Sequence, residues 1–304
     1  MSALAEDLAA AYDGPAARNA PLAPLTRFGL GGPADWLFTP DRDGQLGPLL
    51  ACLHAHGVPV TILGDGTNVL IRDGGVRGAV LRVGRNLADL GWDGDIARCG
   101  AGLAAATLAR RAVEAGRGGF AWAAGLPGSV GGALAGNAGA YGGDMAGATA
   151  AVAGFLPDGA PMLLAGADLR FSYRRSHLPA GAVVTRVDLR LPPLPPDALA
   201  AERERYETIS GKRAAARTAG VRTAGCTFKN PPGEHAGRLI DACGLKGRRR
   251  GGARVFAHHA NFIEALDDTA TAADVEALIE EVAGAVARET GVALEREIRI
   301  YGEA

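Results

Sequence analysis

Two glycine-rich stretches carry the clearest chemical signal in this 304-residue sequence. The first is ILGDGTNVLI (62–71), in which an apolar run leads directly into a Gly-Asp-Gly-Thr-Asn turn. Consecutive backbone N–H groups in such a turn can converge on a diphosphate, and the side chains of Thr67 and Asn68 add donors. Taken alone, such a turn is more typical of an ordinary hairpin. It is not a G-x-G-x-x-G dinucleotide fingerprint, because no third glycine that opens a helix follows. It is not a P-loop either, because no Gly-Lys-Ser/Thr follows.

The second stretch is GGFAWAAGLPGSVGGALAGNAGAYGG (118–143), which contains ten glycines and no charged side chain. It has too few large aliphatic residues to insert into a membrane. A flexible linker is the remaining alternative. Apolar side chains spaced through the stretch instead favour a packed loop, namely Trp122, Leu126, Val130, Leu134 and Tyr141. Glycine lets such a loop approach a flat or phosphorylated ligand closely, and two stretches of this kind suggest a dinucleotide with an extended diphosphate.

Three further segments could carry chemistry. FSYRRSHL (171–178) holds two adjacent arginines. In a strand their side chains point to opposite faces, so at most one of them would face a cleft. The alternative is that both arginines are solvated. TAGCTFKNPPG (223–233) offers Cys226, Lys229 and Asn230 in a turn-rich loop, although a lone cysteine is more often a small buried hydrophobe. KGRRRGGARV (246–255) is a basic run that is either solvated or close to an anionic substrate.

Composition limits the function classes. The chain has 32 basic and 33 acidic residues, so no overall field attracts nucleic acid or a membrane surface. Its four cysteines lack the close pairing of metal and redox motifs, which predicts a reduced protein without a bound metal. Acidic residues near the beginning, with no preceding basic region, predict that no signal peptide is present. We therefore expect a cytoplasmic protein.

The elements that position these segments are mixed. Residues 58–64 and 78–83 are expected to form short buried strands, and residues 103–116 a helix ending at Gly116. Helices and strands do not alternate regularly, which favours an α+β fold. LRLPPLPPDALAAE (189–202) contains four prolines in five positions, and the predicted boundary there separates domains at 1–195 and 196–304.

The C-terminal region has the most regular pattern. A capping box of Thr271 and Asp274 begins a predicted helix that Gly291 ends. The following VALEREIRIYG (292–302) alternates as a strand, which places Glu297 on the side opposite the apolar residues.

Taken in order, ILGDGTNVL, GLPGSVGGALAGNAGAYGG, FSYRRS, GCTFKNPPG with HAGRLIDACGLKG, and LEREIRIYG resemble the UDP-N-acetylenolpyruvoylglucosamine reductase family. The resemblance extends from about residue 25 to residue 302. It implies the FAD-binding fold of vanillyl-alcohol-oxidase-type flavoproteins, followed by a smaller C-terminal α+β substrate domain. It further implies reduction of the enolpyruvyl ether of UDP-N-acetylglucosamine by NADPH in peptidoglycan precursor synthesis, with hydride passing from flavin N5 to C3 of the substrate.

The resemblance also implies residue roles. Arg174 matches the family residue that contacts the enolate and carboxylate oxygens of the substrate. Glu297 matches the glutamate that helps to polarise the same substrate carboxylate. Cys226 matches the residue that donates a proton to C2 of the substrate. The best-known members carry Ser at that last position, and a thiol, with a reference pKa of about 8.5, releases its proton more readily. Substrate contacts are implied for Lys229, Asn230 and His259. FAD contacts are implied for Gly64, Asp65, Gly66, Thr67, Asn68, Val69, Pro127, Gly128, Ser129, Gly132, Asn137, Ala138 and Gly139.

The chain resembles the shorter type of this family, which lacks a Tyr-bearing lid insertion. The clusters Lys212–Arg213 and Arg248–Arg250 are therefore candidates for covering the UDP group. The alternative function is that of an FAD-dependent alcohol or lactone oxidase of the same fold, and a binding module without catalysis is a third. Only small-molecule partners are expected, with no nucleic acid and no membrane.

Overall fold

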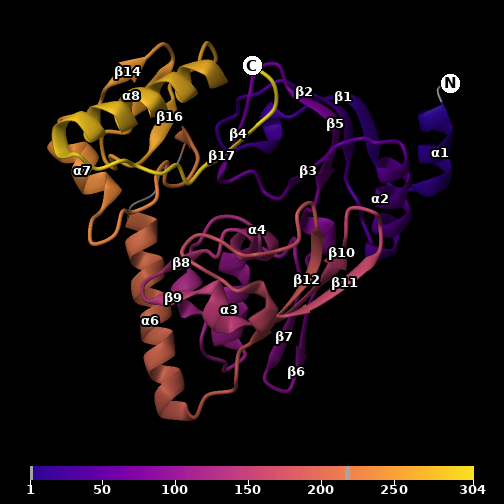
Figure 1. Ribbon diagram of the computed structural model, residues 1–304. Helices are drawn as coiled ribbons and strands as arrows, with labels where there is room; N and C mark the ends of the chain where they lie inside the picture. Colours follow the sequence, from indigo (N-terminus) through magenta and orange to yellow (C-terminus); the bar gives the residue numbers. More distant parts are fainter. Residues whose placement is uncertain (1–2, 216–219) are drawn as a thin grey trace. The chain divides into compact units, whose positions relative to one another are not determined.

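The computed structural model describes residues 3–215 and 220–304, and the chain divides into two compact units (Figure 1). Unit 1 comprises Met1–Ala17, Trp36–Asp65 and Gly78–Arg217, and unit 2 comprises Arg18–Asp35, Gly66–Arg77 and Thr218–Ala304. Each unit has its own cluster of buried apolar side chains. The chain therefore passes between the units several times, whereas the predicted domains changed only once, at residue 195.

Unit 1 is built around an antiparallel sheet whose strand order is β11-β10-β12-β7-β6. These strands are β6 (Leu90–Asp93), β7 (Ile96–Gly100), β10 (Thr149–Phe155), β11 (Pro161–Ala165) and β12 (Val183–Arg190). Opposed positions in the sheet are apolar and buried, as where Val187 faces Val152 on one neighbour and Cys99 on the other. Cross-strand contacts of this kind stabilise a sheet that covers one side of a core.

Helices complete unit 1: α1 (Ala3–Ala11), α2 (Leu46–Ala55), α3 (Ala105–Glu114), α4 (Val130–Ala135), α5 (Met145–Ala148) and α6 (Pro196–Ala215). Short 3-10 turns lie at Asp43–Gln45, Arg85–Leu87, Ala121–Ala123 (η4) and Gly166–Leu169, and β8 (Gly139–Ala140) and β9 (Gly143–Asp144) form a small hairpin. The predicted helix at 103–116 is confirmed as α3, with Gly116 in the left-handed region at φ +71°.

Four strands form a further sheet in the order β1-β2-β5-β3. They are β1 (Ala16–Pro21), β2 (Pro33–Phe38), β3 (Val60–Leu63) and β5 (Val76–Arg82). β3 runs parallel to β5, with Ile62 opposite Leu81. The two strands predicted at 58–64 and 78–83 are confirmed here.

The Pro-rich segment leads into α6, a single long helix (Figure 1). Proline is tolerated in the first helical turn, where its missing N–H has no intrahelical acceptor. α6 packs against α3 and η4 within unit 1. The boundary expected at residue 195 thus lies before a helix that belongs to unit 1.

Unit 2 contains a four-stranded sheet of its own, in the order β13-β16-β15-β14, with α7 and α8. Its elements are β4 (Val69–Ile71), β13 (Arg222–Thr223), α7 (Ala236–Ala242), β14 (Arg249–Arg250), β15 (Ala253–Val255), β16 (Ile263–Ala265), α8 (Ala272–Thr290) and β17 (Arg299–Tyr301), with a 3-10 turn at Ala23–Leu25. α8 confirms the predicted helix, including the Thr271–Asp274 capping box and a left-handed Gly291 at its end. Its apolar face is buried in the core of unit 2.

The strand predicted at 292–302 was too long. Only β17 is regular, and it pairs in parallel with β4. The preceding residues bond instead to the segment around Phe228, where Lys229 N–H donates to Glu295 O at 2.8 Å and Glu297 N–H donates to Thr227 O at 2.8 Å. Because the partner segment changes along the way, the ladder is interrupted.

Among the described residues, no helix combines the length and the apolar character that a membrane crossing requires.

Candidate active site

The two predicted glycine-rich stretches meet within unit 1. Gly64 follows β3, and a Cβ placed on it would lie 3.1 Å from Ser129 Oγ. Ser129 begins α4 as its N-cap, since Oγ accepts from Gly132 N–H at 3.2 Å. Gly128, directly before it, has φ +95°, a conformation in which other side chains are strained. The structure therefore brings residues 64 and 128–132 together; glycine at 64 leaves room for the Ser129 hydroxyl, and Gly128 adopts a conformation that favours glycine.

The remainder of the first turn belongs to unit 2. A Cβ on Gly66 would lie 2.1 Å from Leu25 O, so only glycine fits there. Asn68 joins this turn to the C-terminal segment, because Arg299 N–H donates to Asn68 O at 3.1 Å. The Oδ1 atom of Asn68 is buried and accepts no hydrogen bond from the described protein atoms. A buried acceptor of this kind usually has a partner, which a bound ligand can supply.

The uncharged stretch is a packed loop. Trp122 and Leu134 are buried in the core of unit 1. Tyr141 and Gly142, with φ values of +50° and +79°, form the two-residue turn between β8 and β9. A Cβ on Gly143 would lie 2.3 Å from the Trp122 ring, so the hairpin packs directly on that indole. The linker alternative is therefore wrong.

Arg174 lies in a tight turn, which corrects the expectation of a strand. Ser172 and Arg175 exchange both backbone hydrogen bonds, at 2.9 and 3.0 Å, and enclose Tyr173 and Arg174. Arg174 has φ +56°, an unusual conformation for a side chain without local hydrogen-bonding ability. Its guanidinium lies 5.0 Å from the centre of the Tyr173 ring. Residues held in strained conformations are common at functional sites.

Asn137 holds this turn against the glycine-rich stretch. It is 5% exposed and left-handed at φ +40°. Its Nδ2 donates to Ser172 O at 2.9 Å, and its Oδ1 accepts from Ala146 N–H at 3.0 Å. Ser176 makes a second hydrogen bond between the two segments, because its hydroxyl donates to Ala135 O at 3.0 Å. The structure thus brings Arg174 to the stretch that contains Pro127, Ala138 and Gly139.

In unit 2, Cys226 and Glu297 lie on adjoining segments. Thr227, next to Cys226, accepts from Glu297 N–H at 2.8 Å. Asn68 Nδ2 donates weakly to Glu297 O at 3.4 Å, and Gly225 N–H donates to Thr67 O at 3.2 Å. Cys226 is partly buried and forms no disulfide. The segments that carry the predicted proton donor, the predicted carboxylate and the turn that precedes Val69 are therefore hydrogen-bonded neighbours in one unit.

The three residues expected to contact substrate lie in different local surroundings. Lys229 pairs with the Glu295 carboxylate at 2.5 Å. Asn230 accepts from Ala236 N–H at 3.1 Å near the start of α7. His259 stacks on Phe262 with ring centroids 4.1 Å apart, and the loss of ring hydration lowers the pKa of His259, although the residue as a whole remains exposed.

The two basic clusters differ in their surroundings. Arg213, at the end of α6, lies over the Tyr141 ring at 5.5 Å. Arg248 pairs with Glu281, while Arg249 and Arg250 form the exposed strand β14. Arg213 is therefore directed at the glycine-rich stretch of its own unit.

Known proteins match both parts of the chain. Residues 216–301 match the C-terminal domain of UDP-N-acetylenolpyruvoylglucosamine reductase, and residues 34–154 match an FAD binding domain. A protein named UDP-N-acetylenolpyruvoylglucosamine reductase from Anaeromyxobacter sp. (strain Fw109-5) is 44% identical over 288 residues, which cover 94% of this chain and 88% of the relative. The chain belongs to the UDP-N-acetylenolpyruvoylglucosamine reductase family.

Other members agree. One from Azorhizobium caulinodans is 41% identical over 284 residues, which cover 93% of this chain and 91% of the relative. The crystal structure of the reductase from Thermus caldophilus has a TM-score of 0.78 and 36% identity, and the match covers 95% of this chain and 98% of that one. Family membership confirms the resemblance drawn from the five motifs, and the FAD binding domain confirms the predicted α+β flavin-binding fold. The oxidase alternative is not favoured, because the C-terminal match is to the reductase family.

The residues present fit the flavin that the family implies. The uncharged stretch offers backbone amides and closely packed glycines without placing an ionised side chain beside a flavin ring. The buried Oδ1 of Asn68 has no donor among the described protein atoms, and a bound cofactor could supply one. Among the described residues, no group of three or more His, Cys, Asp and Glu side chains is placed to hold a metal ion.

Three residues that hold these segments escaped the sequence analysis. Glu202 accepts from Gly119 N–H at 2.9 Å and from Ala121 N–H at 3.2 Å, and Arg205 Nη2 donates to Tyr141 O at 2.8 Å. Asn261 is buried and exchanges hydrogen bonds with both backbone groups of Phe228, at 2.9 and 2.8 Å. No sequence motif assigned a role to any of these three residues, and the tertiary contacts identify them.

Proposed function

We propose that this protein reduces the enolpyruvyl ether of UDP-N-acetylglucosamine to UDP-N-acetylmuramate, with NADPH as hydride donor and FAD as bound cofactor. Family membership over nearly the whole chain supports the reaction. The observation that carries the site is the Arg174 turn, which Asn137 and Ser176 fasten to the glycine-rich stretch of the FAD binding domain. The protein then serves peptidoglycan precursor synthesis, and through it cell shape and division.

Bound FAD would supply the hydride-transfer chemistry that links NADPH to C3 of the substrate. We propose that residues 64–69, 127–129, 132 and 137–139 hold this cofactor. Their backbone amides are the suitable donors for a diphosphate, because both polar groups of the Asn137 side chain are already engaged within the protein.

Side chains of the protein would stabilise the negative charge that develops on the substrate and would donate the proton to C2. Addition of a hydride to C3 moves an electron pair toward the carboxylate as an enolate, and the Arg174 guanidinium would stabilise its oxygens. The Cys226 thiol would give its proton to C2, which completes the addition across the double bond. Glu297 would orient the carboxylate end of the substrate, and Lys229, Asn230 and His259 would bind its diphosphate and sugar.

Lys229 would exchange its partner when substrate binds. Its ammonium already pairs with the exposed carboxylate of Glu295. Because that surface ion pair is worth little, a diphosphate can replace it at small cost.

We further propose that the partners are small molecules, without nucleic acid or membrane, and that the protein works in the cytoplasm. The absence of any disulfide among its four cysteines, all within the described residues, supports a reducing compartment.

An anaerobic titration tests the proposal. NADPH added to the purified holoprotein should bleach the flavin absorbance, and UDP-N-acetylglucosamine enolpyruvate should restore it. Bleaching without recovery would contradict the reductase assignment. Bleaching by a simple alcohol, with recovery by oxygen, would favour the oxidase instead.

A further inference from the structure

One face of α6 contacts the uncharged glycine-rich stretch at its beginning. A single carboxylate oxygen of Glu202 accepts from Gly119 N–H and Ala121 N–H, at 2.9 and 3.2 Å. Both amides lie at the entry to the short turn η4, where a carboxylate satisfies donors that the backbone leaves unpaired. α6 therefore fixes the first residues of the stretch.

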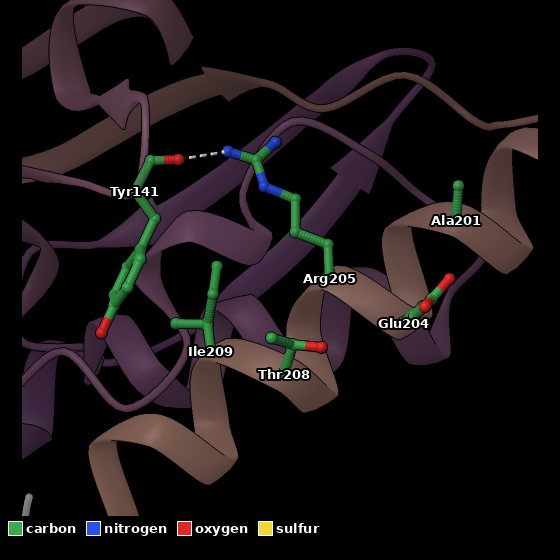
Figure 2. Close-up of a pocket in the computed structure, with 6 residues that line it drawn as sticks. All are labelled: Tyr141, Ala201, Glu204, Arg205, Thr208 and Ile209. Atoms are coloured by element: carbon green, nitrogen blue, oxygen red, sulfur yellow. Dashed lines mark hydrogen bonds between the residues drawn. The ribbon is translucent and has the colours of Figure 1, made fainter.

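The same face contacts the end of the stretch (Figure 2). Arg205 Nη2 donates to Tyr141 O at 2.8 Å, and the Arg213 guanidinium lies 5.5 Å from the Tyr141 ring centre. Glu202, Arg205 and Arg213 are three and eight residues apart, which places them along one side of a helix. Buried Ile209 packs on this side as well. An open pocket of about 350 Å³ adjoins the contact, lined by Tyr141, Ala201, Glu204, Arg205, Thr208 and Ile209.

The middle of the stretch is also covered. A Cβ on Gly125 would lie 3.0 Å from the Arg213 side chain. One helix thus reaches the beginning, the middle and the end of a segment with ten glycines. A segment so rich in glycine loses much conformational freedom when it orders, and Tyr141 is held in a strained left-handed conformation.

We propose that Glu202 and Arg205 are positioning residues that preorganise the glycine-rich stretch for FAD. The inference rests on the proposed function, since it assumes that this stretch binds the cofactor. Neither side chain needs to touch FAD. Their hydrogen bonds raise the fraction of protein whose loop is already in the binding conformation, and apparent affinity scales with that fraction.

The test measures FAD affinity of the apoprotein by the change in flavin fluorescence. Glu202→Ala removes a charged acceptor shared by two amides and should raise the FAD dissociation constant about tenfold. Glu202→Gln keeps an oxygen at the same place and should recover part of the loss. Arg205→Ala should also weaken FAD binding. Glu207→Ala and Arg203→Ala change exposed residues of the same types on α6 and should bind FAD as the unaltered protein does.

The measurements distinguish a preorganising role of Glu202 and Arg205 from a purely structural one. A purely structural role would lower the melting temperature of the apoprotein while leaving the FAD dissociation constant unchanged well below that temperature, and this result would overturn the inference. If Glu202→Ala does not fold, Glu202→Gln and Arg205→Ala decide the matter by the same measurement. Failure of the unaltered protein to bind FAD would instead reject the proposed function.

Discussion

Replacing Asn137 tests how the Arg174 turn is held. Its side-chain amide makes two hydrogen bonds, one to Ser172 O and one from Ala146 N–H. Loss of each should cost about 1 kcal/mol. Asn137 also has φ +40°, and forcing alanine into the left-handed region adds about 1 kcal/mol. Asn137→Ala should therefore lower the free energy of unfolding by about 3 kcal/mol, or Tm by about 6–12 °C.

Asn137→Asp removes the hydrogen bond to Ser172 O and keeps the one from Ala146 N–H. An aspartate keeps the acceptor for Ala146 N–H but, when ionised, faces the Ser172 carbonyl with no hydrogen to donate. At pH 7 we expect a loss of about 1–2 kcal/mol in unfolding free energy. Below about pH 4 the carboxyl is protonated, can donate to Ser172 O, and should recover most of this loss relative to the unaltered protein at the same pH.

The assays are denaturant unfolding of the apoprotein and the two half-reactions of the holoprotein. Reduction by NADPH should change little in Asn137→Asp, whereas reoxidation by the enolpyruvyl substrate should slow, because Arg174 loses its orientation. Asn19 is a matched control, since it is exposed and left-handed at φ +48°. Asn19→Ala should cost only about 1 kcal/mol. Equal reoxidation rates for Asn137→Asp and the unaltered protein at pH 7 would refute the positioning role.

Three further outcomes are expected. Cys226→Ala should leave reduction by NADPH nearly intact and slow the substrate half-reaction by at least about 100-fold, while Cys226→Ser retains much of it, and stopped-flow absorbance would show whether both steps instead fall together. Gly143→Ala places a methyl group into the buried Trp122 ring and should cost about 1–3 kcal/mol of unfolding free energy, which urea titration would detect. Burial, and then the charge of Asp188, raise the pKa of Cys99 to about 12, so this thiol stays neutral in the folded protein. Iodoacetamide at pH 8 should therefore modify Cys99 only after unfolding, and mass spectrometry showing labelled Cys99 in the native protein would contradict this.

Local sequence rules account for the elements that were predicted well. The helix α8 begins at the Thr271–Asp274 capping box and ends at Gly291, as expected, because these signals act within one turn of the chain. α3 and its terminal Gly116 follow in the same way. The order of the five motifs likewise identifies the family from the sequence, since each motif is a contiguous run of residues.

Other features depended on contacts that local sequence does not encode. Arg174 lies in a left-handed turn rather than a strand, which Ser172 and Arg175 close locally and which Asn137, distant in sequence, binds through the Ser172 carbonyl. The C-terminal strand is short because its first half pairs with the segment around Phe228. The position of the turn and the short C-terminal strand both depend on long-range hydrogen bonds, which local alternation of side chains does not encode.

The sequence by itself determined the helices with capping signals, the glycine-rich turns and the identity of the chemical groups. The tertiary structure decided which segments share a compact unit and which side chains hold them. The Pro-rich segment illustrates the difference, because its prolines interrupt strand and helix locally, yet α6 directly afterwards brings Glu202 and Arg205 onto the glycine-rich stretch. Propensity acts over a few neighbouring residues, whereas the position of a segment depends on which distant backbone donors and acceptors it satisfies.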